Sequence, residues 1–263
     1  MATANIGDIT IGYDDEGAGE ALVLVHGHPF DRSMWRPQVE RFSRAGWRVI
    51  APDLRGYGES TVVPGKTTLD VFARDIAGLL DRLGVARFVL GGLSMGGQIV
   101  LECHRLFPHR LRGLVLADTS APADTEEARQ WRRATAERLP REGMRPYAEE
   151  VLYKMVSRDA PPEVAAHVLG MMLGTDPEGA AAALRGRAER PDYVAMLAGV
   201  AVPALVVVGA EDEFTPVAEA RLMSDTIPDA RLVVVEGAAH MPNLERPDDF
   251  DEALHEFLSK AAG

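Results

Sequence analysis

The segment Phe88-Val89-Leu90-Gly91-Gly92-Leu93-Ser94-Met95-Gly96-Gly97 decides how this chain folds. A short apolar run ends in glycines, a serine follows, and the next residues suit a helix, so the pattern is G-x-S-x-G between a strand and a helix. A serine on so sharp a turn has a strained backbone, which forces together the residues two positions before and after it. Gly92 and Gly96 stand there, where a Cβ atom would clash. We therefore expect the Ser94 hydroxyl to project at the carboxyl end of the strand, above the positive end of the helix. The alternative is a glycine-rich turn with an incidental serine.

Composition and charge bound the class of protein. The chain has 263 residues, of which 46% are apolar, enough for one α/β domain with an insertion and a large core. The formal net charge of −12 argues against nucleic acids and anionic membrane surfaces as partners. No apolar run of about 18 residues is present, so no membrane span is expected. The one cysteine, Cys103, cannot form an internal disulfide, and no signal peptide is visible, so we expect a cytoplasmic protein.

Buried strands and helices alternate along most of the chain. Residues 5–13 alternate loosely and predict an edge strand. Continuous apolar runs predict buried strands at 21–25, 47–51 and 203–209, and further strands are expected at 88–93, 114–118 and 231–235. Helices are expected at 34–45, at 69–83 with a Thr68 cap, from Ser94 through Phe107, at 216–227 and at 248–260. This order predicts an α/β fold with a mostly parallel central sheet and helices on both faces.

The alternation is interrupted between residues 121 and 200, where helical patterns occur without a strand pattern. Residues 1–120 and 201–263 are therefore expected to form the core, and 121–200 an all-helical lid over the strand ends. Arginines in this segment, Arg129, Arg132 and Arg133 among them, could bind a substrate carboxylate but are expected to be solvated on its surface. An apolar substrate pocket of modest size is predicted from Phe30, Met155, Met171, Phe214 and Met241.

Three side chains that suit nucleophilic catalysis each follow a predicted strand. A serine is a poor nucleophile at its free pKa and needs a base within hydrogen-bond reach. A histidine can serve as that base when a carboxylate fixes its tautomer. Ser94, Asp212 and His240 occur in that order, and the carboxyl ends of parallel strands gather at one edge of a sheet. Other candidates for the acid are Asp118, at the end of an earlier strand, and Glu211 and Glu213 beside Asp212.

The loop His26-Gly27-His28-Pro29-Phe30 follows a buried strand and allows two interpretations. One is a tight turn before a helix. The other is an oxyanion loop, whose backbone N–H groups face the serine. The loop stands well before the serine in the sequence, as the second role requires. His26 and His28 are themselves candidates for the base, but a loop that supplies oxyanion contacts favours His240 in that role.

Several other polar residues suit structural roles. Asp53 and Arg55 lie in a loop rich in turn residues, and we expect them to pair with each other or with backbone groups. Cys103 is expected to be an inert core thiol. His104 and His109 belong to no motif and are expected on the surface.

The chain resembles the α/β-hydrolase superfamily over nearly its whole length. The segments that carry the resemblance are His26–Pro29, Asp53–Gly58, Gly92–Gly97, Gly209–Asp212 and Gly237–Pro247. The resemblance implies that Ser94 is the nucleophile, Asp212 the acid and His240 the base. It also implies that the oxyanion donors are the backbone N–H groups of His28 and Met95, and that the reaction uses no metal or cofactor.

Within the superfamily, the chain is most similar to small carboxylesterases and 3-oxoadipate enol-lactonase-like proteins. Serine rather than aspartate at position 94 argues against the haloalkane dehalogenases and epoxide hydrolases of this fold. Carbon–carbon bond hydrolases often have asparagine at the position of Leu93 and a more glycine-rich oxyanion loop, so the chain resembles them less. Cofactor-free perhydrolases and haloperoxidases share the triad, so the triad does not separate them from esterases.

The resulting prediction is a serine hydrolase that cleaves a small carboxylic ester or lactone through an acyl-serine intermediate. The alternatives within the fold are a perhydrolase, a haloperoxidase or a carbon–carbon bond hydrolase. An alternative of another class is a catalytically slow, receptor-like protein that binds a ligand. The sequence leaves the natural substrate and the oligomeric state open.

Overall fold

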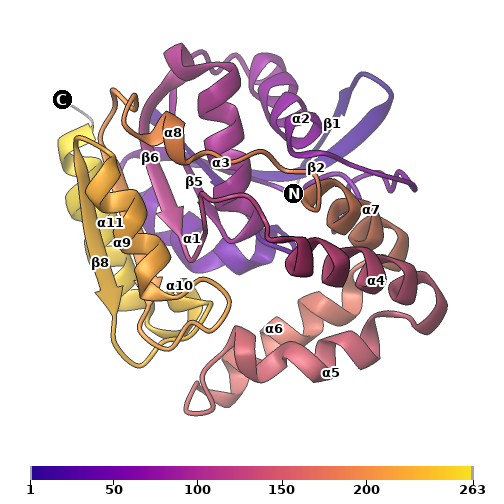
Figure 1. Ribbon diagram of the computed structural model, residues 1–263. Helices are drawn as coiled ribbons and strands as arrows, with labels where there is room; N and C mark the ends of the chain where they lie inside the picture. The colour runs from indigo at the N-terminus through magenta and orange to yellow at the C-terminus, as the bar shows by residue number, and fades with distance from the viewer. Residues whose placement is uncertain (1, 262–263) are drawn as a thin grey trace.

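An eight-stranded sheet forms the centre of the computed structural model, which describes residues 2–261 (Figure 1). The strands are β1 (Ala2–Ile6), β2 (Ile9–Glu16), β3 (Glu20–Val25), β4 (Trp47–Pro52), β5 (Phe88–Leu93), β6 (Leu111–Ala117), β7 (Ala204–Gly209) and β8 (Ala230–Val235). They lie in the order β1-β2-β4-β3-β5-β6-β7-β8, and all neighbours from β4 onward are parallel. The predicted α/β fold with a mostly parallel sheet is confirmed.

Helices cover both faces of this sheet. They are η1 (Arg32–Trp35), α1 (Arg36–Arg44), α2 (Leu69–Arg82), α3 (Met95–Leu106), η2 (Pro108–Arg110), α4 (Glu126–Glu142), α5 (Met144–Met155), α6 (Pro162–Gly174), α7 (Pro177–Arg187), α8 (Val194–Leu197), α9 (Val217–Thr226), α10 (Pro242–Glu245) and α11 (Pro247–Ala261). Among residues 2–261, no helix combines the length and the apolar character that crossing a membrane requires.

The alternation of side chains along the strands divides the core into two layers. Successive residues of a strand point to opposite faces of the sheet. Leu24 of β3 therefore belongs to one apolar cluster, which includes Phe42 of α1 and Phe250 of α11. Val25 belongs to the other, which includes Phe72 of α2 and residues of α3 and α9. The central strands β3, β5, β6 and β7 are almost entirely buried, as continuous apolar runs predict, whereas β1 and β8 at the two edges are only partly buried.

The amino-terminal edge of the sheet differs from the single strand expected over residues 5–13. β1 and β2 form an antiparallel hairpin in which Ile6 pairs with Ile9. Gly7, with φ +61°, provides the left-handed conformation that this tight turn uses. The prediction missed β1 because Ala2–Asn5 are small or polar residues without an apolar alternation.

Two helix starts also differ from expectation. The helix expected from Met34 begins as the 3₁₀ turn η1, where the Asp31 carboxylate accepts a hydrogen bond from the Ser33 N–H (2.8 Å). α2 begins at Leu69 as expected, but the predicted side-chain cap is wrong. The Thr68 hydroxyl donates to the Asp70 carboxylate (2.6 Å) and accepts no hydrogen bond from the N–H groups of the helix backbone.

Helices α4 to α8 occupy the segment 121–200, which contains no strand. Figure 1 shows α4, α5 and α6 together at one end of the molecule. α7 packs closely on the core, because a Cβ atom on Gly179 would lie 2.0 Å from the carbonyl oxygen of Gly56. The Thr175 hydroxyl, between α6 and α7, donates to the carbonyl oxygen of Pro29 (3.0 Å). The helical segment is thereby fixed to the loop that follows β3, whereas its action as a lid stays a prediction.

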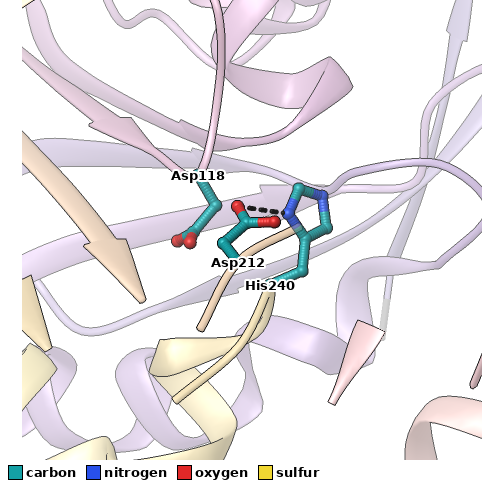
Figure 2. A group of neighbouring side chains, drawn as sticks. All are labelled: Asp118, Asp212 and His240. Atoms are coloured by element: carbon teal, nitrogen blue, oxygen red, sulfur yellow. Dashed lines mark hydrogen bonds and ion pairs between the residues drawn. The ribbon is translucent and has the colours of Figure 1, made fainter. Parts of the chain in front are cut away.

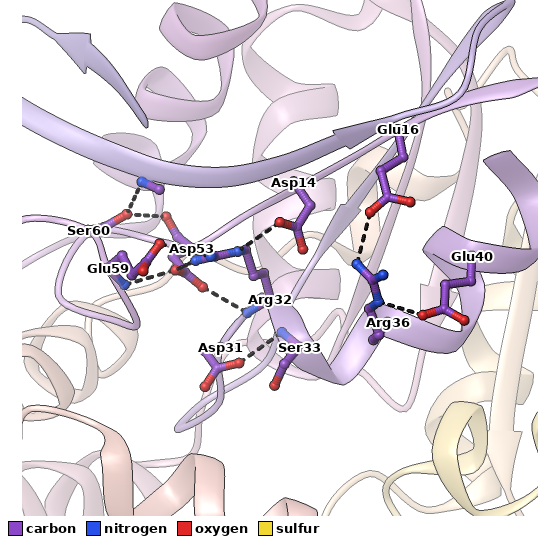
Figure 3. Close-up of polar contacts among 11 residues, drawn as sticks. Asp14, Glu16, Asp31, Arg32, Ser33, Arg36, Glu40, Asp53, Glu59 and Ser60 are labelled. Carbon is purple, nitrogen blue, oxygen red and sulfur yellow. Dashed lines mark hydrogen bonds and ion pairs between the residues drawn. The ribbon is translucent and has the colours of Figure 1, made fainter. Parts of the chain in front are cut away.

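The Asp53 carboxylate, fully buried just after β4, joins separate segments of the core (Figure 3). It accepts hydrogen bonds from the backbone N–H groups of Arg32 (2.8 Å) and Glu59 (2.9 Å), and it forms an ion pair with the Arg32 guanidinium. Arg55 instead forms an ion pair with Asp75 of α2 (2.6 Å). The expected backbone contacts of Asp53 are present, but the expected pair between Asp53 and Arg55 is wrong, because each side chain finds its partner on another segment.

Removing the Asp53 carboxylate should destabilise the protein because it leaves the buried Arg32 charge with poorer compensation. We expect Asp53→Ala to lower the free energy of unfolding by about 3–5 kcal/mol, which lowers the melting temperature by roughly 6–20 °C in a chain of this size. Glu59→Ala is the matched control. Glu59 also pairs with Arg32 (2.8 Å), but its side chain is 45% exposed, so a loss of about 0–1 kcal/mol is expected. Thermal unfolding followed by circular dichroism measures both variants, and similar losses in the two would contradict this account.

Candidate active site

Ser94 stands on the turn between β5 and α3 in a backbone conformation that non-glycine residues rarely adopt. Its φ is +57° and its ψ is −116°, and its N–H donates to the carbonyl oxygen of Ala117 on β6 (2.9 Å). A Cβ atom on Gly92 would lie 2.3 Å from the carbonyl carbon of Gly96, and one on Gly96 would lie 2.2 Å from the carbonyl oxygen of Val25. The turn therefore requires both glycines, as its sequence pattern predicts.

His240 and Asp212 are hydrogen-bonded to each other. Nδ1 of His240 lies 2.8 Å from Oδ2 of Asp212, and both residues are buried (Figure 2). The Thr215 hydroxyl donates to Oδ2 of Asp212 (2.6 Å), and the backbone N–H groups of Phe214 and Thr215 donate to Oδ1 (2.8 and 3.2 Å). Burial opposes ionisation of Asp212, but His240 and the Thr215 donors outweigh it and lower the pKa of this carboxyl. The contact can fix the tautomer of His240 and stabilise its protonated form.

Asp118, the main rival for the acid, has a different environment. It follows β6 with φ +43° and lies beside Asp212 and His240, where one ligand atom of each residue lies within 4.8 Å of the others (Figure 2). Its Oδ1 accepts the Gly209 N–H (2.9 Å), whereas its Oδ2 has no partner in the described part of the chain. Burial and the neighbouring Asp212 raise the pKa of Asp118 well above the usual range, so its surroundings favour the neutral carboxyl. A metal ion here would have to displace the hydrogen bond between Asp212 and His240.

The rival bases are occupied elsewhere or lie apart. Nε2 of His26 accepts the Leu54 N–H (2.9 Å), so its Nδ1 donates to the carbonyl oxygen of Gly27 (2.8 Å), and both ring nitrogens hold the loop together. His109 is exposed, as expected. His104 is 8% exposed, so its expected surface position is wrong. It lies on the inner part of α3, where burial lowers its pKa.

One cavity of about 370 Å³ brings Ser94 and His240 together with His28. Two of the predicted pocket residues, Met155 and Phe214, line it, and the Phe214 ring lies 5.2 Å from that of His240. The other three are not among its lining residues. Phe30 and Met241 are fully buried and Met171 is 4% exposed, all in one apolar cluster. Their apolar character reflects packing in the core, so the prediction that places them in the pocket is wrong.

The polar part of this cavity is not predicted by the sequence patterns. Residues of the wall that those patterns do not single out are Gln98, Ser120, Asp124, Trp131, Tyr147, Arg187 and Arg190. Arg132 is expected in solvent, but its side chain is only 14% exposed and lines the cavity. Arg187 is the last residue of α7, and Arg190 lies beyond its end, so no helical spacing marks the pair. Their position in the wall depends on how α4 and α7 pack.

Comparison with known proteins agrees with this geometry. The chain matches the alpha/beta hydrolase family over residues 22–253. It is similar to a thermophilic esterase from Thermogutta terrifontis, solved with malate bound, at 42% identity and a TM-score of 0.96 over 99% of this chain and 97% of that one. The enol-lactonase from Burkholderia xenovorans LB400 has 30% identity and a TM-score of 0.91, over 98% of this chain and all of its own. The 2-hydroxy-6-oxononadienedioate/2-hydroxy-6-oxononatrienedioate hydrolase of Burkholderia vietnamiensis is 31% identical over 96% of this chain and 92% of its own length.

A parallel sheet with helices on both faces and a serine on the strand-to-helix turn defines a hydrolase of the α/β fold. The chain belongs to the α/β-hydrolase family. Its esterase and enol-lactonase relatives confirm the predicted branch and support a hydrolase.

The raised pKa of Asp118 has a consequence for stability. Folding raises the pKa of this carboxyl, so its contribution to stability is complete below its unfolded pKa of about 3.9 and is lost as the pH rises toward its folded pKa. An asparagine side chain cannot ionise and keeps an acceptor for the Gly209 N–H, so Asp118→Asn should melt at a higher temperature than the wild type at pH 7. The difference should shrink toward about pH 4. Melting curves across this range measure it, and a difference that does not depend on pH would refute the assignment.

Proposed function

We propose that the protein hydrolyses a small carboxylic ester or lactone through an acyl intermediate on Ser94. The observation that carries the proposal is the buried hydrogen bond between His240 and Asp212 beside the cavity that Ser94 also lines. This arrangement supplies a nucleophile, a base with a fixed tautomer and a space of the size that holds a small molecule.

In the proposed reaction, His240 takes the proton of the Ser94 hydroxyl as the oxygen attacks the ester carbonyl carbon. The protonated imidazole is stabilised by the Asp212 carboxylate and returns the proton to the departing alcohol oxygen. A water molecule, deprotonated by His240, then attacks the acyl-serine; the bond to the Ser94 oxygen breaks, His240 returns the proton to that oxygen, and the carboxylic acid leaves. A lactone follows the same steps, except that its ring opens in the first attack and the alcohol stays joined to the acyl group through the carbon chain, so the product is one hydroxy acid.

The negative charge on the carbonyl oxygen needs donors beside Ser94, and we assign them to the backbone N–H groups of His28 and Met95. Met95 is the first residue of α3, so its N–H has no acceptor within the helix. His28 lies in the loop after β3, the strand that pairs with β5. Preorganised donors of this kind contribute strongly to acyl transfer, on the order of 10²–10³ in kcat for one donor.

The proposal extends to the remaining sequence predictions. Residues 121–200 act as a lid on the cavity, the substrate is a small molecule, and the protein works in the cytoplasm without a metal or cofactor. The perhydrolase, haloperoxidase and carbon–carbon bond alternatives use the same three residues and differ in the substrate that the cavity selects. A receptor-like protein differs in kind, because its serine need not react.

Replacing Ser94 tests whether the protein is an enzyme. We expect Ser94→Ala to lose on the order of 10⁴-fold or more in kcat on p-nitrophenyl acetate, because only the binding and oxyanion contributions remain. A fluorophosphonate probe should label the wild type at Ser94 and leave the variant unlabelled. Near wild-type turnover by purified Ser94→Ala ends the proposal. A folded wild type that binds a ligand tightly without reacting with the probe favours the receptor.

Replacing each aspartate identifies the acid. Asp212→Asn should keep the fold but lower kcat roughly 10³–10⁴-fold, because the amide favours the wrong imidazole tautomer. Asp118→Asn should cost less than about tenfold, because the amide resembles the neutral carboxyl that burial and Asp212 favour. The measurement is kcat on an activated ester, with the melting temperature as the control for folding. A crippled Asp118→Asn beside a nearly normal Asp212→Asn would show that Asp118 is the acid.

A further inference from the structure

The catalytic cavity carries positive charge although the chain as a whole is acidic. Three arginines, Arg132, Arg187 and Arg190, line it, against one carboxylate, Asp124. The formal charge of the chain is −12. Excess cationic groups in a low-dielectric cleft favour anionic ligands.

Asp124 neutralises only part of this charge. Its Oδ2 accepts from Nε of Arg132 (2.5 Å), and its Oδ1 accepts from Nη2 of Arg190 (3.0 Å), so each carboxylate oxygen already has an arginine partner. Arg187 makes no ion pair within residues 2–261. Its hydrogen-bond partner is the neutral Gln98, whose Oε1 accepts from Nε of Arg187 (3.1 Å).

The Arg187 side chain is therefore a buried cation with unused donors. The residue is 7% exposed. Its terminal nitrogens are not among the fully enclosed polar atoms, and Arg187 lines the cavity, so these nitrogens open toward it. Burial and the neighbouring Arg132 lower its pKa to about 9, and the guanidinium stays protonated at neutral pH. A buried charge without a countercharge is costly unless a ligand supplies one.

His28 lies on the same wall and bears on the charge of Arg187. Tyr57 is buried, and Nδ1 of His28, 2.7 Å away, is the partner of its hydroxyl. Nε2 of His28 is enclosed and has no hydrogen-bond partner in the described chain. Burial and the charge of Arg187 hold the pKa of His28 well below its usual range, so the ring is neutral.

We propose that the Arg187 guanidinium forms a subsite for a carboxylate, so that the substrate is an ester or lactone carrying a second, ionised carboxyl group. Cleavage of the ester or lactone bond rests on the proposed function, whereas binding of the carboxylate does not depend on it. A carboxylate has two acceptor oxygens for the unused donors of Arg187, and its charge matches the guanidinium. Arg132 and Arg190, already paired with Asp124, add to the field without being direct ligands.

The position of Gln98 limits the length of this substrate. Gln98 lies one helical turn after Ser94, and its N–H donates to the carbonyl oxygen of Ser94 (3.1 Å). Side chains four residues apart on a helix are roughly 5–6 Å apart. The hydrogen bond between Gln98 and Arg187, and the one between Arg187 and the substrate carboxylate, each add about 3 Å to the distance from Ser94. A compact dicarboxylic monoester, with a spacer of about two to four carbons between its carboxyl groups, spans distances of this order.

Binding without turnover tests the subsite directly. The probes are the monomethyl esters of succinate, glutarate and adipate, each compared with the neutral methyl ester of the same chain length, and binding to Ser94→Ala protein is measured by calorimetry. We expect at least one charged ester to bind about 10- to 100-fold more tightly than its neutral partner, the range that a hydrogen bond to a charged group provides. Equal affinity for all three pairs would overturn the subsite.

Substitutions at Arg187 locate the preference. Combined with Ser94→Ala, Arg187→Gln should abolish the preference for the charged ester, whereas Arg187→Lys should restore part of it. Arg133→Gln is the matched control, because Arg133 is on α4 but is 56% exposed and outside the cavity wall, and the preference should survive it. If Arg187→Gln does not fold, as judged by its melting curve, Arg187→Met removes the charge while keeping an unbranched side chain. A preference that persists without the Arg187 charge would refute the proposal.

Turnover by the wild type separates this inference from the proposed function. The wild type should hydrolyse the charged ester with the higher kcat/KM of the pair. If the wild type hydrolyses none of the esters and the fluorophosphonate does not label Ser94, the proposed function is overturned. The carboxylate subsite is decided separately, by the difference in affinity that calorimetry measures.

Discussion

The contact between the Ser94 turn and the end of β3 is the constraint on which the site depends. Gly96 approaches the carbonyl oxygen of Val25 so closely that even a Cβ atom does not fit. Because Val25 is the last residue of β3, this contact holds the following loop, with His28, against the serine. The pairing of β5 with β3 and β6 brings the carboxyl ends of these strands to one edge of the sheet. The strained backbone of Ser94 is stable because neighbouring segments fix it from both sides.

Much of this arrangement could be predicted from the sequence because it depends on local patterns. Strands buried on both faces appear as continuous apolar runs, and the sharp turn appears as glycines at fixed positions around Ser94. The placement of Asp212 beside His240 follows from consecutive strands, β7 and β8, that pair with each other. No long-range packing has to be known for these steps. The hairpin at the amino terminus was missed where the local pattern was weak.

The cavity wall could not be predicted because it depends on how inserted helices pack. Apolar character shows that a residue is buried, but it does not distinguish the core from a pocket, and Phe30 and Met171 belong to the core. An arginine pattern on a helix likewise suggests a solvated face. Arg187 is buried because Gly179, on the same helix, lets α7 approach the loop at Gly56. This long-range contact places Arg187 beside Gln98, in the wall of the cavity that Ser94 also lines.

Two carboxyl groups at the ends of adjacent strands, β6 and β7, have pKa values shifted in opposite directions, and the number of donors around each decides the direction. Asp212 accepts a hydroxyl and two backbone N–H groups and has His240 beside it, which together outweigh the cost of burying its charge. Asp118 accepts only the Gly209 N–H, and Asp212 already places a negative charge next to it. Two neighbouring carboxylates cannot both ionise cheaply, so the better solvated one takes the charge. The loop from Asp212 to Thr215 thereby determines which aspartate can orient His240.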